Sequence, residues 1–127
     1  MVNLVGQQLG NYHLVRHLGS GSFADVYLGK HTHLETLCAI KVLNRRHIYS
    51  DMDDFRNEAK LIASLDHPHI VKVLDFDIEN HIPFFVMTYV PNGSLRQLHP
   101  KGTRLSLATT IVYTKEIASA LQYAEKL

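Results

Sequence analysis

The spacing of apolar residues changes partway along the chain, and this change limits the possible folds more than any other feature of the sequence. Short apolar or alternating segments predict β-strands. Five such segments occur, over residues 12–18, 24–29, 37–43, 70–76 and 83–90. Between the third and the fourth segment, apolar residues recur every three or four positions, at Phe55, Ile62 and Leu65 with Ala59 beside them. That spacing predicts a helix.

The ends of the helices are also marked in the sequence. Ser50 or Asp51 can cap the first helix, and Pro68 ends it because the residue before a proline avoids the helical region. A Pro-Asn-Gly break follows the last strand, and residues 94–98 form a short helix at most. Ser106 is the expected cap of a long final helix.

The order of these elements predicts an α+β fold, in which an antiparallel sheet of five strands carries one helix and a helical segment follows. We divide the chain into a lead-in over residues 1–10, a sheet domain over 11–90 and a helical segment over 91–127. The final helix carries an apolar stripe. Its members are Leu107, Ile111, Ala118, Leu121 and Ala124.

The composition excludes several classes of protein. With a formal charge of +1, the chain has no strong field to attract nucleic acid or a membrane surface. The N-terminus lacks the features of a secretory signal, and the longest apolar stretch is far shorter than the roughly 20 residues that span a bilayer. The single cysteine, Cys38, cannot form an internal disulfide. This suits a reducing compartment, and we expect a cytoplasmic protein.

The nine histidines are scattered along the sequence. Two pairs, His31 with His33 and His67 with His69, are two residues apart, but no nearby cysteine or aspartate cluster completes a four-ligand site. We therefore predict no metal-ligating residue.

A glycine-containing segment, GSGSFADV, joins the first two predicted strands. Glycine allows a backbone to approach a bulky anion, and free backbone N–H groups can bind phosphate oxygens. Because a strand follows the loop, and not a helix, a dinucleotide-binding fold is disfavoured. A hairpin that simply needs two flexible residues remains an equally good interpretation of this segment.

Two charged residues lie where local patterns predict apolar ones. Lys41 interrupts an apolar strand, on the face of Ala39 and opposite Ile40. Glu58 shares the apolar face of the first helix, where a lone carboxylate is costly to bury. Each residue taken alone could be solvated at an edge, but pairing with the other explains both, and a lysine held in this way could reach phosphates at the glycine loop.

Together these motifs resemble the N-terminal lobe of a eukaryotic-like serine/threonine protein kinase. GSGSFADVY, CAIKVL and FRNEAKLIASL match its glycine-rich loop, third-strand lysine and helix glutamate, in that order. HPHIVKV resembles the entry to the fourth strand, and FFVMTYVPNGSL the fifth strand and hinge. The resemblance covers residues 11–127, and the wording of residues 9–43 is similar to bacterial members of the family.

The resemblance implies roles at the phosphate end of an ATP site. Lys41 would contact the α- and β-phosphates, and Glu58 would hold Lys41. The loop over the phosphates would consist of Gly19, Ser20, Gly21 and Ser22. Mg²⁺ would accompany the ATP, and the substrate of the complete protein would be another protein.

It also implies roles at the adenine end. The residues that would sandwich the adenine are Leu18, Val26 and Ala39. Met87 would be the gatekeeper at the back of the pocket, and the backbone of Thr88 and Val90 would hydrogen-bond the adenine edge. The column of apolar residues that supports the helix would include Ile62 and Val73.

Three positions depart from the family pattern. Ala24 replaces a frequent third glycine, Cys38 replaces a valine of similar size, and Thr88 replaces an acidic hinge residue whose backbone matters more than its side chain. None of these changes weakens the expectation of ATP binding.

The catalytic loop, the Mg²⁺-holding residues and the activation segment of the family have no counterpart in these 127 residues. We therefore expect the isolated chain to be inactive and, with its final apolar stripe uncovered, to self-associate through residues 105–127. The alternative to part of an active kinase is a nucleotide-binding or interaction module without enzyme activity, such as a truncated kinase or a pseudokinase. The intact Lys41 and Glu58 favour the former.

Overall fold

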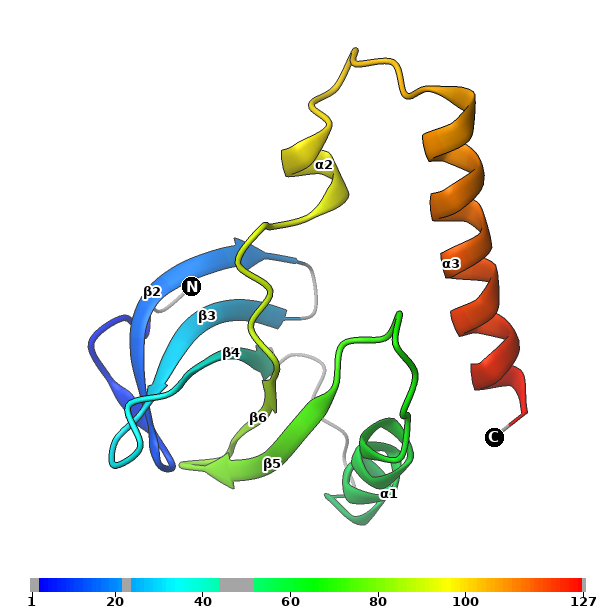
Figure 1. The fold of residues 1–127 in the computed structure, drawn as a ribbon. Coiled ribbons are helices and arrows are strands. Elements are labelled where there is room, and N and C mark those ends of the chain that lie inside the picture. The colour runs from blue at the N-terminus through cyan, green and yellow to red at the C-terminus, as the bar shows by residue number, and fades with distance from the viewer. Residues whose placement is uncertain (1–2, 22–23, 44–51, 127) are drawn as a thin grey trace.

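A computed structural model describes residues 3–21, 24–43 and 52–126, apart from the side chains of residues 52–55 and Glu58. The chain forms one curled antiparallel sheet with a helix beside it, and two further helices follow (Figure 1). This confirms the predicted α+β class.

The sheet contains six strands in the order β1-β2-β3-β4-β6-β5, and every neighbouring pair is antiparallel. The strands are β1 (Gln8–Leu9), β2 (Tyr12–Ser20), β3 (Ala24–His31), β4 (Leu37–Leu43), β5 (Val73–Glu79) and β6 (Ile82–Met87). Five of these are the strands predicted from the sequence, with ends shifted by up to three residues.

The sequence did not predict β1, which lies in the expected lead-in. Gly10, with φ of +55°, turns the chain so that Leu9 pairs with Tyr12. Leu9 is 3% exposed, and Leu4 packs against the same apolar cluster. Leu4 and Leu9, both within the expected lead-in, therefore pack with the core of the sheet domain.

The sheet buries a different apolar cluster on each face. The larger cluster is on the face covered by the N-terminal segment, and it consists of Leu9, Leu14, Tyr27, Cys38, Ile40, Val42, Phe84 and Val86. The opposite face carries Val73 and Phe85, which pack against Ala59 of the helix. We call the face with the larger cluster the outer face, and the face that packs against α1 the helix face.

Helix α1 (Met52–Ala63) contacts the sheet mainly through β5. Its predicted caps, Ser50 and Asp51, lie outside the described residues. Ala59, 3% exposed, is its buried contact with the sheet. Ile62 was expected in the supporting apolar column together with Val73, but it is 38% exposed and does not belong to that cluster. Among the described side chains of α1, Ala59 is the one that packs in this cluster.

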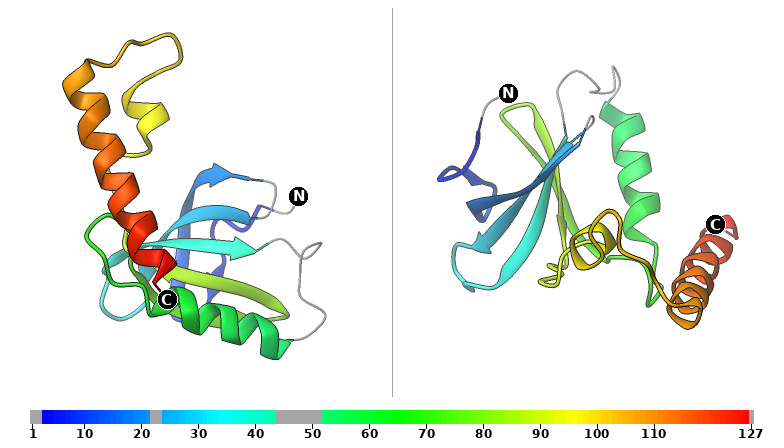
Figure 2. Two further views of the ribbon diagram at one scale, coloured as in Figure 1. Left: turned by 90° about the vertical axis from the view of Figure 1, so that its right-hand side faces the viewer. Right: turned by 90° about the horizontal axis from the view of Figure 1, so that it is seen from above.

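Helices α2 (Leu95–Leu98) and α3 (Leu107–Glu125) begin where the sequence predicts. Ser94 caps α2 by accepting a hydrogen bond from the Gln97 amide, and Ser106 caps α3 by accepting one from the Thr109 amide. Seen from above, α1 lies between the sheet and α3 (Figure 2). Within the described chain, no helix is both long and apolar enough to cross a membrane.

The loop after α1 connects to α3 through polar contacts. The Asp66 amide donates a hydrogen bond of 2.9 Å to the Tyr123 hydroxyl, and His67 Nε2 lies 3.1 Å from Ser119 Oγ. The apolar stripe of α3 remains exposed, with Leu107 at 76% and Leu121 at 61%. Polar contacts at Ser119 and Tyr123 thus join the C-terminal half of α3 to the loop after α1.

Candidate functional site

The strand register brings the predicted phosphate-end residues into one row. Gly19 pairs with Val26, Val26 pairs with Lys41, and Lys41 pairs with Phe85 on β6. Directly paired residues in antiparallel strands point to the same face of a sheet. Phe85 packs against Ala59 of α1, so this row lies on the helix face.

The adenine-end residues share that face. Ala39 pairs with Met87, and it lies two residues from Lys41 on β4. Ala39 is buried and Met87 is half-buried. A single surface on the side of α1 therefore carries Gly19, Val26, Lys41, Ala39 and Met87.

Lys41 is exposed, whereas its neighbours Ile40 and Val42 are 0% and 7% exposed on the outer face. This confirms the face that strand alternation predicts for Lys41. Glu58 lies in α1, one position before the buried Ala59. Its side chain is outside the described residues, so the Lys41–Glu58 ion pair stays a prediction.

The fold itself does not require glycine at positions 19 and 21. Neither residue has a positive φ. Among the described residues, a Cβ atom added at Gly19 would meet nothing within 4 Å, and at Gly21 it would meet only the Ala24 carbonyl oxygen at 3.6 Å. The Gly21 amide donates a 2.8 Å hydrogen bond to that oxygen. Packing against the described residues therefore does not explain either glycine.

The segment after β6 presents backbone groups to the same end of the sheet. The Thr88 amide donates a 3.0 Å hydrogen bond to the Lys72 carbonyl. No described backbone amide donates to the Thr88 carbonyl, which is therefore available. In the described part of the chain, the Val90 amide has no hydrogen-bond partner. Arg16 donates a 3.4 Å hydrogen bond to the Tyr89 hydroxyl, which ties this segment to β2.

The structure describes only some of the remaining predicted loop residues. Leu18 is half-buried, at a register shift between His17 and Gly19. Ser20 is exposed at the end of β2, and Ser22 lies outside the described residues. The described residues contain no group of three potential metal ligands.

Two hollows lie away from this surface. One, of about 400 Å³, is between α1 and β5, and the other, of about 300 Å³, is between α2 and α3. Neither is lined by any of the predicted site residues. The predicted site is instead an open sheet face under a loop.

A polar cluster beside the glycine loop was missed in the sequence. His17 Nε2 lies 3.3 Å from Asp25 Oδ1 and 3.0 Å from Ser20 Oγ. The only signal was that a histidine and an aspartate flank the loop, and without the strand register that signal is too weak to use.

Comparison with known proteins shows which family this chain is similar to. Residues 12–127 match the family described as protein tyrosine and serine/threonine kinase. The chain is 33% identical over 128 residues to serine/threonine-protein kinase PrkC of Bacillus subtilis, covering 97% of this chain and 19% of that protein. It is 39% identical over 124 residues to a probable serine/threonine-protein kinase of Streptomyces coelicolor, SCO3848, covering 92% of this chain and 18% of that protein.

Solved structures agree with the sequence comparisons. The chain superposes on the kinase domain of Mycobacterium tuberculosis PknI with a TM-score of 0.80 and 26% identity, covering 98% of this chain and 52% of that domain. It thus spans about half of a kinase domain and about a fifth of these two curated relatives. The match of the family over residues 12–127, together with these similarities, shows that the chain belongs to the protein tyrosine and serine/threonine kinase family.

Proposed function

We propose that this chain binds ATP on the helix face of its sheet, as the nucleotide-binding part of a serine/threonine protein kinase. The complete protein would transfer the γ-phosphoryl group of ATP to serine or threonine hydroxyls of a protein substrate. The observation that carries the proposal is the register that aligns Gly19, Val26 and Lys41 on one face, two residues from the Ala39–Met87 pair.

Each part of the surface suits one part of ATP. The bare backbone of Gly19 and Gly21 can approach the phosphates, and the exposed Lys41 ammonium can neutralise their charge. Leu18, Val26 and Ala39 offer an apolar surface for the adenine ring, with Met87 at its back. This matches the usual combination of an apolar pocket with a few polar groups that fix orientation.

The backbone after β6 supports a specific orientation of the adenine. The free Thr88 carbonyl can accept a hydrogen bond from an exocyclic amine, and the Val90 amide can donate one to a ring nitrogen. Because the Thr88 amide is already bonded to Lys72, only its carbonyl is available. This refines the expectation that both residues contribute backbone groups.

Phosphoryl transfer requires further groups that these residues do not supply. Mg²⁺ bound to ATP would neutralise charge on the phosphates, but the described residues contain no candidate ligand set for it. We therefore expect the 127-residue polypeptide to bind nucleotide without transferring phosphoryl groups. Residues 11–90 would be the nucleotide-binding lobe, and residues 91–127 the hinge and first helices of the second lobe.

A nucleotide-binding or interaction module without enzyme activity is the second candidate. For either candidate we propose a cytoplasmic location, which agrees with the free buried thiol of Cys38. Phosphorylation of a generic basic protein by the complete gene product, but not by an otherwise identical variant lacking Lys41, would support the kinase over the second candidate.

Binding of Mg-ATP to the 127-residue chain, measured by isothermal titration calorimetry, tests the nucleotide site directly. Lys41→Ala should weaken binding roughly tenfold or more, because a charge-assisted contact to phosphate is lost. Lys30→Ala is the matched control, since Lys30 is also an exposed strand lysine but lies four residues beyond Val26, away from the loop. Equal affinities of wild type and Lys41→Ala would refute the role of Lys41.

A further inference from the structure

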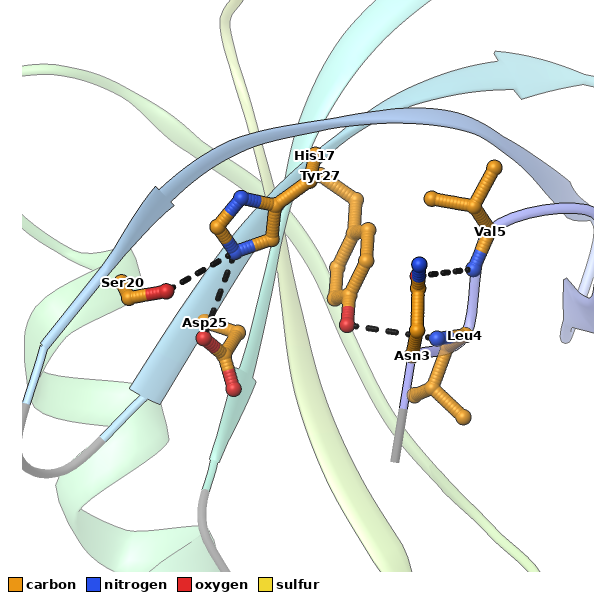
Figure 3. Close-up of polar contacts among 7 residues, drawn as sticks. All are labelled: Asn3, Leu4, Val5, His17, Ser20, Asp25 and Tyr27. Carbon is orange, nitrogen blue, oxygen red and sulfur yellow. Dashed lines mark hydrogen bonds and ion pairs between the residues drawn. The ribbon is translucent and has the colours of Figure 1, made fainter. Parts of the chain in front are cut away.

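The outer face of the glycine-loop hairpin carries a polar cluster whose function the nucleotide site does not explain. It consists of His17, Ser20 and Asp25, which we call the His17 cluster (Figure 3). His17 and Ser20 belong to the end of β2 that leads into the loop, and Asp25 belongs to the start of β3 that leaves it. The cluster therefore joins the two strands at the base of the loop.

The geometry places the cluster on the face away from the proposed nucleotide. Asp25 and Tyr27 flank Val26 on β3, so their side chains point to the opposite face from Val26. Tyr27 is 2% exposed in the outer cluster and pairs with His17. Since the proposed nucleotide lies on the Val26 face, the His17 cluster cannot touch it, and any effect must act through the loop.

The surroundings of His17 hold its ring in a defined position. The ring packs edge-on against the Tyr27 ring, with centroids 5.3 Å apart at 80°. The Tyr27 hydroxyl accepts a hydrogen bond of 3.4 Å from the Leu4 amide, so the N-terminal segment helps to hold the Tyr27 ring in place (Figure 3). Among the described residues, the titratable groups in contact with His17 are Asp25 and Tyr27, both from β3.

The arrangement differs from the triad of a serine hydrolase. In that triad the aspartate and the serine meet opposite nitrogens of the histidine ring. Here Asp25 and Ser20 both meet Nε2. A proton relay through the ring is therefore impossible, and the cluster is a contact between strands.

We propose that His17 is a positioning residue that holds Gly19 and Gly21 near the nucleotide phosphates by joining β2 to β3 when the imidazole is protonated. This inference rests on the proposed nucleotide site. In the protonated ring, Nε2–H donates a charge-assisted hydrogen bond to the Asp25 carboxylate. In the neutral ring the charge is lost, and if the proton is on Nδ1, Nε2 can only accept a hydrogen bond from Ser20. The contact between β2 and β3 is thus stronger when the ring carries a positive charge.

The expected effect is modest, because His17 is 40% exposed and Asp25 is 14% exposed. Partly exposed ion pairs of this kind correspond to about a two- to five-fold change in an equilibrium constant. When β2 and β3 are already joined, less conformational freedom is lost on ligand binding. Nucleotide affinity should therefore be higher when His17 is protonated.

The test compares binding of a non-hydrolysable Mg-ATP analogue to the 127-residue chain and its variants from pH 5.5 to 8. Wild type should bind about two- to five-fold more tightly than His17→Gln at pH 5.5 and equally at pH 8. Taking this ratio removes the protonation of the ligand itself, which is common to both proteins. His17→Lys, a permanent cation, should retain the advantage at both pH values.

The Asp25→Asn variant distinguishes a positioning role of His17 from direct attraction between the His17 charge and the phosphates. If Asp25 is the partner, wild type and Asp25→Asn should differ only at low pH, and His17→Gln/Asp25→Asn should bind no more weakly than either single variant. If Asp25→Asn keeps the pH dependence of wild type, the His17 charge attracts the phosphates directly and the positioning role is wrong. A wild type to His17→Gln ratio that does not vary with pH would overturn it as well.

Hydrogen exchange of the Gly21 amide, measured without nucleotide, distinguishes failure of this inference from failure of the proposed function. That amide closes the loop on the Ala24 carbonyl, and it should exchange more slowly in wild type than in Asp25→Asn at pH 5.5. Absence of nucleotide binding by wild type refutes the proposed function, and with it the positioning role. Normal binding with identical exchange and identical affinities in all variants refutes the His17 inference alone.

Discussion

Glycine occupies positions in this chain for different physical reasons. Gly29, in the middle of β3, is required by packing, because an added Cβ would lie 2.5 Å from Ile40 Cγ1 and 3.1 Å from Cys38 Sγ. Gly19 and Gly21 meet no such obstacle. At the scale of single residues, core packing explains Gly29 but not Gly19 or Gly21, and we propose that these two admit the nucleotide phosphates.

This difference predicts opposite effects of alanine substitutions. Gly29→Ala should destabilise the fold by about 1–3 kcal/mol through overpacking, as measured by urea denaturation. Gly19→Ala and Gly21→Ala should leave the denaturation midpoint almost unchanged but weaken Mg-ATP binding, because a methyl group would stand where phosphates approach. Loss of stability in Gly19→Ala, with nucleotide affinity unchanged, would reverse this assignment.

Cys38 is the only cysteine, and it is 4% exposed beneath the outer face. Burial raises the pKa of its thiol to about 11, because the thiolate is poorly solvated there. We predict that the folded chain reacts very slowly with a thiol reagent at pH 8, and that the rate still rises with pH beyond 9. The urea-unfolded chain, in which the thiol has its ordinary pKa, is the control and should react at once. Rapid labelling of the folded chain at pH 8 would contradict the buried position.

At the scale of elements, the loop after α1 connects the sheet domain to α3. The Asp66 amide bonds to the Tyr123 hydroxyl, and the rings of His67 and Tyr123 lie 5.3 Å apart. The His67 ring also accepts a hydrogen bond at Nδ1 from the His69 amide, which orients Nε2 toward Ser119. Polar groups, and not apolar burial, thus determine where the C-terminal half of α3 lies.

Replacement of Tyr123 by phenylalanine tests this connection. The substitution removes the hydrogen bond to the Asp66 amide while keeping the aromatic ring, and it should cost about 1 kcal/mol. We expect faster hydrogen exchange at Asp66 and altered chemical shifts at His67. Tyr113→Phe is the matched control, because it removes a 2.9 Å contact with His99 elsewhere on the same helix. Equal exchange at Asp66 in both variants would show that the contact does not form in solution.

At the scale of the whole molecule, apolar side chains are distributed unevenly. The sheet domain buries two clusters, whereas α3 has no buried residue. Leu107, Ile111 and Leu121 on its predicted stripe are 76%, 44% and 61% exposed. Contiguous apolar surface of this kind favours association with other proteins.

We predict that the 127-residue chain self-associates through residues 105–127, with sedimentation coefficients that increase with protein concentration. Leu107→Glu/Leu121→Glu should restore a monomer, because charged residues in the stripe oppose burial. Ala108→Glu/Val112→Glu adds the same charge beside the stripe and should have a smaller effect, because each of these exposed residues lies one position, about 100° around the helix, beyond a stripe residue. A monomeric wild type at high concentration would contradict the prediction.

The sequence could predict where many residues of the candidate site lie, because their positions depend on local geometry. Alternation along one strand is enough to place Lys41 opposite Ile40, and one serine before a helix is enough to predict the cap at Ser106. The Lys41–Glu58 pair, by contrast, depends on how α1 lies against the sheet, and it remains a prediction.

The sequence by itself determined the order of the helices and of every strand except β1, the face of the sheet on which Lys41 lies and the position of the glycine loop, because each follows from residue spacing within one segment. Only the tertiary structure decided that Leu9 joins the core, that Ala59 and not Ile62 meets the sheet, and that His17 meets Asp25. These contacts depend on the register between strands and on the rotation of a helix. Both are determined by the packing of the whole domain, which no single segment encodes.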